Sequence, residues 1–264
     1  MNRILYTKVM TPVLSIFLGC FLFSAFACGE GDYTPKKYRG LKGKVVSIRD
    51  SVYDCTLQGS YQLPGEFTEA ETVDFDAEGN VIRIARHNAD SSFVTVSEFA
   101  YKDNVLVSSC GQSLMGGDAF TSTSERIGVE NGILKFKEDN GSEQYIREVK
   151  TNGKYCMEYS KYTNGYSKEE SWADNNDNII KTRSLLVSSD MEFMNGTNTL
   201  EEISLMKYDK DGNLTEATHI KDKDTITTVC SHHRYDKYGN WTEERAETNG
   251  YFKRLIKRTI KYTD

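Results

Sequence analysis

The sequence has few prolines and sparse helical signals, and beyond its N-terminal run it has none of the usual signatures of membrane helices or redox sites. Only 3 of its 264 residues are proline. Beyond one run near the N-terminus, no segment has the roughly 18 uninterrupted apolar residues that a membrane helix needs. No Cys-x-x-Cys pair occurs, which argues against a thioredoxin-like redox site and a zinc ribbon. Positive charge is not in excess either: the net charge is -6, which argues against nucleic acid and anionic lipid headgroups as partners.

The N-terminal residues predict export. Arg3 and Lys8 precede an uncharged apolar stretch over residues 9–27, and this stretch ends in Ala25-Phe26-Ala27. We therefore predict a signal peptide over residues 1–27. Because this leader contributes two positive charges and no negative ones, the mature chain carries a net charge of -8.

The residue after the leader is Cys28, followed by the polar run Gly29-Glu30-Gly31-Asp32. This arrangement resembles the lipobox of bacterial lipoproteins, in which the cysteine becomes the acylated first residue. Ala25 stands where lipoboxes usually have Leu, so a soluble periplasmic protein that begins with Cys28 is an alternative, and Cys20 is a second candidate anchor.

An acidic tether after the acylated cysteine resembles signals that send lipoproteins of Gram-negative anaerobes to the outer face of the outer membrane. We predict a lipid-anchored protein of the Gram-negative cell envelope, placed in the outer membrane, and the sequence leaves open whether it faces the exterior or the periplasm. Residues 28–42 form the anchor and tether, and residues 43–264 form a single domain.

Two nearly identical nonapeptides predict the architecture of that domain. "YDKDGNLTE" covers residues 208–216, "YDKYGNWTE" covers residues 235–243, and "FDAEGNVIR" is a third copy over residues 75–83. Each fits a type I turn whose last glycine takes the left-handed conformation in a G1 bulge, which predicts Gly79, Gly212 and Gly239 as turn residues. The aspartate at the first position of each turn accepts hydrogen bonds from backbone amides ahead of it.

The segments between these turns read as strands. A spacing of about 27 residues corresponds to two strands and two turns, one at each end of a sheet. For the C-terminal part we predict five antiparallel strands, at about 201–209, 213–221, 225–236, 240–248 and 251–262. Residues 108–125 read instead as the most loop-like interior stretch.

This pattern resembles the YD-repeat proteins, the Rhs-like family whose units carry Tyr-Asp-x-x-Gly-Asn before each return strand. The resemblance covers roughly residues 43–262. It implies an all-β antiparallel meander of hairpins in one large curled or barrel-like sheet, and it implies no catalytic residues. Long members enclose a cavity with a closed shell, for which this chain is too short. Small secreted lipoproteins of unknown function that consist of one such curled sheet are also similar.

Candidate site residues are few. Four cysteines follow the leader and allow two disulfides in three pairings, with buried free thiols as the alternative; they are Cys55, Cys110, Cys156 and Cys230. Aromatic side chains either pack across strands or stack on sugar rings; the candidates for stacking are Tyr155, Tyr159, Tyr162, Tyr166, Trp172 and Trp241.

Catalytic and metal-binding patterns are weak. Cys230 and His232 share one face of a strand, and His219 on the preceding strand is a conceivable third ligand, although packed or solvated histidines are the simpler interpretation. We predict no metal and no cofactor. The adjacent acids Glu169 and Glu170 point to opposite faces of a strand, so they cannot flank one glycosidic bond.

Two triplets, Asp50-Ser51-Val52 and Asp224-Thr225-Ile226, resemble bacterial O-glycosylation sites, although matches this short also arise by chance.

These observations favour a non-enzymatic binding or interaction module at the outer membrane, with an outer-membrane protein or a glycan as partner. One alternative is a carbohydrate-binding accessory lipoprotein that uses exposed tyrosine and tryptophan. A second alternative is a hydrolase whose site the sequence does not show.

Overall fold

The fold is an antiparallel β-barrel. A computed structural model of the protein describes residues 41–58, 61–115, 118–189 and 197–263, and these residues contain sixteen strands and no helix. Accordingly, no helix in this part of the chain is long and apolar enough to cross a membrane. The signal peptide, Cys28 and most of the tether lie outside the described residues.

The strands follow one another around the barrel in chain order. They are β1 Val45–Gln58, β2 Tyr61–Phe75, β3 Val81–Asn88, β4 Phe93–Lys102, β5 Val105–Met115, β6 Asp118–Glu130, β7 Ile133–Asp139, β8 Gln144–Asn152, β9 Tyr155–Tyr162, β10 Gly165–Ala173, β11 Ile179–Ser188, β12 Thr199–Tyr208, β13 Leu214–Lys221, β14 Asp224–Tyr235, β15 Trp241–Thr248 and β16 Tyr251–Tyr262.

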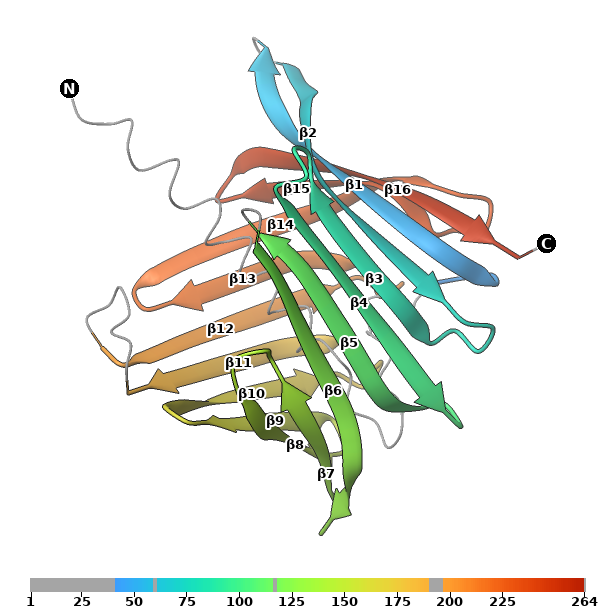
Figure 1. The fold of residues 1–264 in the computed structure, drawn as a ribbon. Helices are drawn as coiled ribbons and strands as arrows, with labels where there is room; N and C mark the ends of the chain where they lie inside the picture. Colours follow the sequence, from blue (N-terminus) through green and yellow to red (C-terminus); the bar gives the residue numbers. More distant parts are fainter. Residues whose placement is uncertain (1–40, 59–60, 116–117, 190–196, 264) are drawn as a thin grey trace.

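The barrel is closed by pairing between the first and the last strand (Figure 1). β1 pairs with β16 from Val45 opposite Tyr262 to Asp54 opposite Arg254. Across this seam the guanidinium of Arg258 donates two hydrogen bonds to the carboxylate of Asp50, at 2.7 and 2.6 Å. The expectation that the chain is too short for a closed shell is therefore corrected in one respect: the sheet does close around its circumference.

The repeated turns have the predicted geometry. Gly79, Gly212 and Gly239 have φ values of 89°, 82° and 84°. In the first turn the Gly79 amide donates to the Asp76 carbonyl at 3.2 Å, and the Asp76 carboxylate accepts from two backbone amides ahead of it. A fourth turn of this kind lies at residues 174–178, where Asp177 takes the glycine position with φ 66°.

Each repeated turn also uses its asparagine, which the sequence analysis left without a role. The Nδ2 atoms of Asn80, Asn178 and Asn213 donate to the carboxylate of the aspartate four residues earlier, at 2.9, 3.1 and 3.0 Å. The Asp-x-x-x-Asn spacing thus locks the turn with a side-chain pair. All four turns lie at one end of the barrel, because successive turns of a meander alternate between its ends; we call this the turn end.

The five predicted C-terminal strands are confirmed as β12 to β16, with ends within two residues of the predictions. The loop predicted over residues 108–125 is wrong, because residues 108–115 and 118–125 belong to the long strands β5 and β6. Their small side chains suit close packing rather than a loop: a Cβ atom at Gly111 would lie 2.7 Å from Oγ of Ser122 on β6.

One face of the sheet is buried and therefore forms the inside of the barrel. An apolar core fills it near the turn end; its buried members are Ile48, Val73, Phe75, Val81, Phe99, Leu106, Phe136, Val149 and Cys156. Farther from the turn end, the inward side chains of the same strands include ion-paired residues such as Arg86 with Glu71 and Arg147 with Glu138.

The residues just before β1 are tied into the seam by Asn240. The side chain of Asn240 accepts a hydrogen bond from the Lys42 amide and donates to the Lys42 carbonyl and the Tyr262 hydroxyl, each at 2.8 Å. Asn240 is only 6% exposed, and its loss would remove three part-buried hydrogen bonds together.

We predict that Asn240→Ala lowers the free energy of unfolding by about 2–3 kcal/mol, because three part-buried hydrogen bonds are lost together. Asn213→Ala is the matched control, since that side chain bonds only within its own turn, and we expect about 1 kcal/mol. Urea unfolding of the two variants measures the difference. Equal losses would mean that the bonds to Lys42 and Tyr262 add nothing to stability.

Candidate binding surface on the outer wall

Strand alternation divides the six predicted stacking residues into two groups. Tyr155 and Tyr159 on β9 point outward, as do Tyr166 and Trp172 on β10, since their neighbours Cys156 and Ser160 are buried inside. Tyr162 and Trp241 point inward, so six residues that looked alike in the sequence have two different environments.

The four outward rings form what we call the outer aromatic strip: Tyr155, Tyr159, Tyr166 and Trp172. Their ring centroids lie 5.4 Å apart for Tyr155 and Trp172 and 5.8 Å apart for Tyr159 and Tyr166, both tilted pairs. All four side chains are half-buried and keep part of their surface in water. Such pairs contribute cross-strand packing energy and still leave ring surface for a partner.

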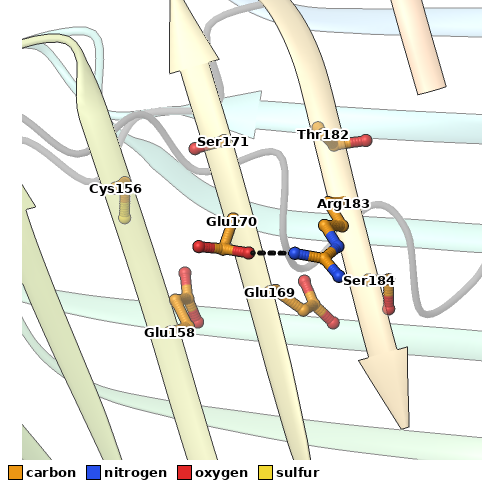
Figure 2. Close-up of a pocket in the computed structure, with 8 residues that line it drawn as sticks. All are labelled: Cys156, Glu158, Glu169, Glu170, Ser171, Thr182, Arg183 and Ser184. Atoms are coloured by element: carbon orange, nitrogen blue, oxygen red, sulfur yellow. Dashed lines mark ion pairs between the residues drawn. The ribbon is translucent and has the colours of Figure 1, made fainter. Parts of the chain in front are cut away.

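Charged groups lie between the two ring pairs. Glu170 accepts a hydrogen bond from the Tyr155 hydroxyl at 2.6 Å and pairs with Lys168 at 2.9 Å. Arg183 on β11 pairs with Glu170 at 3.5 Å and with Glu201 at 2.7 Å, and Figure 2 shows the Arg183 guanidinium directed at Glu170. Lys181 places its ammonium 4.8 Å from the centre of the Trp172 ring, within cation–π range.

These contacts set the protonation states at the strip. Burial alone would raise the pKa of Glu170, but hydrogen bonds from Tyr155 and Lys168 and the nearby charges of Lys168 and Arg183 outweigh it and lower that pKa. Burial, followed by the contact with Glu170, raises the pKa of Tyr155 to about 12. At neutral pH the strip therefore presents an ionised carboxylate and a phenol that keeps its proton.

The two inward aromatic residues pack rather than face solvent. Tyr162 stacks edge-on against Tyr145, with ring centroids 4.7 Å apart. Trp241 lies against the His232 ring, and the guanidinium of the buried Arg258 sits 3.5 Å above its centre. The packing interpretation therefore fits Tyr162 and Trp241.

A group of ionised side chains lines the inner wall beside the strip. Arg147 bonds the carboxylates of Glu138 at 2.7 Å and Glu158 at 2.9 Å, and its guanidinium lies 4.4 Å from the centre of the Phe136 ring. Burial raises the pKa of Glu158 despite the opposing effect of Arg147. The positive charge of Arg147 therefore compensates the two inward carboxylates, which lowers the energetic cost of burying them.

A small hollow adjoins this group. Glu158 on β9 lies directly opposite Glu169 on β10, whereas Glu170 points to the other face as predicted (Figure 2). The hollow beside them has a volume of about 10 Å³ and is also lined by Thr182 and Ser184. This volume suits one water molecule, and the buried Thr182 hydroxyl, which has no partner in the described structure, could bond such a water.

The predicted cysteine and histidine sets do not assemble. Cys55, Cys110 and Cys230 are free thiols, so no disulfide joins any two of the four cysteines. His232 bonds Glu244 at 3.0 Å, and His219 bonds Ser204 at 3.2 Å on a different pair of strands. Among the described residues, no group of three His, Cys, Asp or Glu side chains could hold a metal ion.

The two glycosylation triplets lie on β1 and β14. The Asp50 carboxylate is engaged by Arg258, and Ser51 is half-buried, whereas Thr225 is exposed.

The charged members of the outer surface were missed in the sequence. Lys168, Lys181 and Arg183 were not identified there, and Glu170 was considered only as the neighbour of Glu169. The alternation of side chains along the strand was the available signal. Lys168 and Glu170 lie at even-numbered positions, as do Tyr166 and Trp172 on the same strand, so all four side chains point to its outward face.

Comparisons with known proteins add little. No family model matches the chain, and no curated protein matches it. One similar solved structure is a porin-like protein from Bacteroides vulgatus ATCC 8482, with 10% identity, a TM-score of 0.40, and coverage of 83% of this chain and 98% of that chain. Another is a porin-like protein from Bacteroides uniformis ATCC 8492, with 10% identity, a TM-score of 0.35, and coverage of 84% of this chain and 99% of that chain. At these values the likeness says nothing about what this chain binds. The hairpin meander implied by the YD-repeat resemblance is present, whereas membership of that family stays a prediction.

We predict that Arg147→Met lowers the free energy of unfolding by about 3–5 kcal/mol at pH 7, because it leaves two inward carboxylates unpaired. Arg183→Met is the matched control on the outer face; its side chain is 41% exposed, and we expect a loss of at most about 1 kcal/mol.

The loss in Arg147→Met depends on pH. A glutamate whose folded-state pKa is raised contributes stability below its unfolded pKa of about 4.3 and loses it as the pH rises through the folded value. The deficit of Arg147→Met is therefore smallest near pH 4 and grows toward pH 7, as denaturant unfolding across this range can measure. A deficit that matches Arg183→Met, or that does not vary with pH, would contradict the role given to Arg147.

Proposed function

We propose that the protein is a lipid-anchored barrel of the Gram-negative cell envelope whose wall stands in water and binds a partner without catalysis. In this proposal the acylated Cys28 provides attachment to the outer membrane. The observation that carries the proposal is the charge on the outward face of the strands.

Outward charged residues occur on many strands, some well inside the strand, such as Lys137, Arg245 and Lys257, and others near its ends, such as Lys161 and Lys207. They include Arg83 on β3, Lys137 on β7, Lys150 on β8, Lys161 on β9, Lys181 on β11, Lys207 on β12, Arg245 on β15 and Lys257 on β16. A barrel that spans a membrane needs an outward apolar band about 25 Å tall, and a Lys or Arg at the bilayer midplane costs about 2–4 kcal/mol. Some outward apolar side chains stand among charged ones instead; Val229, for example, lies opposite Glu216 and Glu247 on the neighbouring strands.

The inside of the barrel favours binding over catalysis. Glu138 and Glu158 are committed to Arg147, Asp50 to Arg258 and Glu71 to Arg86. The hollow beside Glu158 and Glu169 is far too small for a sugar ring or a peptide. The hydrolase alternative therefore gains no support from the described residues.

The position of the first described residues suggests how the barrel is oriented. Lys42 is bonded to Asn240 at the turn end. Twelve residues separate Cys28 from Leu41, and even fully extended they span at most about 40 Å. The turn end would therefore lie toward the membrane, with the side wall and the opposite end available to partners.

We predict that the full-length protein sediments with membranes and is released only by detergent, whereas Cys28→Ala is released without detergent because its wall has no affinity for lipid. Cys20→Ala is the matched control and should behave as the wild type. Fractionation of cells that express each form, with mass measurement of the N-terminal peptide, tests this.

Two outcomes would count against the proposal. If Cys28→Ala remained in the membranes after alkaline extraction, the barrel itself would be embedded. If the wild type were soluble and its Cys28 unmodified, the anchor would be wrong.

A further inference from the structure

The structure points to a glycan-binding site on the outer aromatic strip, and we propose that a polysaccharide chain lies along β9 and β10. This inference deepens the proposed function, because it names the class of partner that a water-exposed wall would bind. It rests on the way rings and charged groups alternate on this surface.

A sugar ring offers two kinds of surface, an apolar face of C–H groups and a rim of hydroxyl groups. The strip provides a counterpart for each. Half-exposed rings at Tyr155 with Trp172 and at Tyr159 with Tyr166 can stack on C–H faces. Between the two ring pairs the outward ammonium of Lys168 can donate hydrogen bonds to sugar hydroxyl groups, and the Glu170 carboxylate, bonded by Lys168 and Tyr155, holds it in place.

The spacing of the ring pairs favours a chain over a single sugar. Tyr155 and Tyr159 are separated by four residues of one strand, which places them about 14 Å apart. Both pairs lie on the same face of two neighbouring strands, so they form a row of ring surfaces along the outer wall rather than a pocket. A row of this length contacts several successive sugar units.

Other classes of partner fit less well. An apolar protein interface is depleted of charge at its core, whereas here Lys168 and Glu170 lie between the rings. A nucleic acid would meet Glu170 and Glu201 on the same surface and a chain of net negative charge. Lipid is excluded by the same charges that keep the wall in water.

The charged groups also hold the rings in place. Tyr155 is fixed by its bond to Glu170, and Lys181 lies against the Trp172 ring. Because these side chains are already ordered, little rotamer entropy remains to be lost when a ligand binds.

The test uses the full-length protein purified in detergent and five immobilised probes: a neutral β-glucan, a mannan, heparin, polygalacturonate and peptidoglycan. We expect at least one probe to bind. For that probe, Trp172→Ala and Tyr159→Ala should each weaken binding at least tenfold, which corresponds to about 1.4 kcal/mol. Trp172→Phe keeps an aromatic face and should retain most of the affinity.

The matched control is Tyr53→Ala. Tyr53 on β1 forms a similar outward cross-strand pair with Phe67, with ring centroids 5.9 Å apart and Lys257 over its ring, outside the strip. It should leave binding unchanged. Thermal unfolding of each variant separates loss of the site from loss of the fold.

The inference is overturned if none of the five probes binds. It is also overturned if folded Trp172→Ala binds the probe as tightly as the wild type, or if Tyr53→Ala weakens binding as much as Trp172→Ala does. The membrane fractionation described above does not depend on these rings. If fractionation shows the anchor while no glycan binds, only the glycan-binding site is contradicted. If a glycan binds while fractionation shows no anchor, the glycan-binding site stands and the lipid anchor is contradicted.

Discussion

Pairing between β1 and β16 is the interaction on which the rest of the structure depends. Every other strand pair joins sequence neighbours through a short connection, whereas this pair joins segments about two hundred residues apart. Closure gives each strand two partners, and it separates an inner face from an outer one. Without it, the buried ion pairs and the apolar core near the turn end would be open to water along one side.

The two faces of the wall have the reverse of the usual arrangement in membrane barrels. Charged residues occur on the outside of many strands, while the inside combines an apolar core with ion pairs such as Arg147 with Glu138 and Glu158. Arg147 compensates the charges of the two glutamates that it bonds, as burial requires. This arrangement is consistent with a barrel that needs water on its outer surface and takes its membrane attachment from elsewhere in the chain.

Local features of the fold could be read from the sequence, because local interactions determine them. The turns at Gly212 and Gly239 and the strands β12 to β16 follow from residues within one hairpin. Residues 108–125 were misread because serine and glycine are typical of loops in isolation, while here they suit tight packing between β5 and β6. Closure could not be predicted, since the β1–β16 pairing leaves no local signal.

The candidate site was predictable only in part. Aromatic composition identified all four members of the strip, but it also included Tyr162 and Trp241, which point inward. Counting strand parity within β9 would have separated Tyr162 from Tyr155 and Tyr159. The register that brings Arg183 to Glu170 depends on how β10 pairs with β11, which the sequence does not specify.

The long-range seam also has a consequence for the order of folding. Hairpins between sequence neighbours form quickly, but β1 gains its second partner only when β16, the last strand, is available. Until then the sheet has two free edges that could pair with another chain. Arg49 on β1 and Lys257 and Lys261 on β16 lie along those edges, and such charges discourage pairing between molecules. The same residues that face water in the finished barrel thus protect the nascent sheet from aggregation.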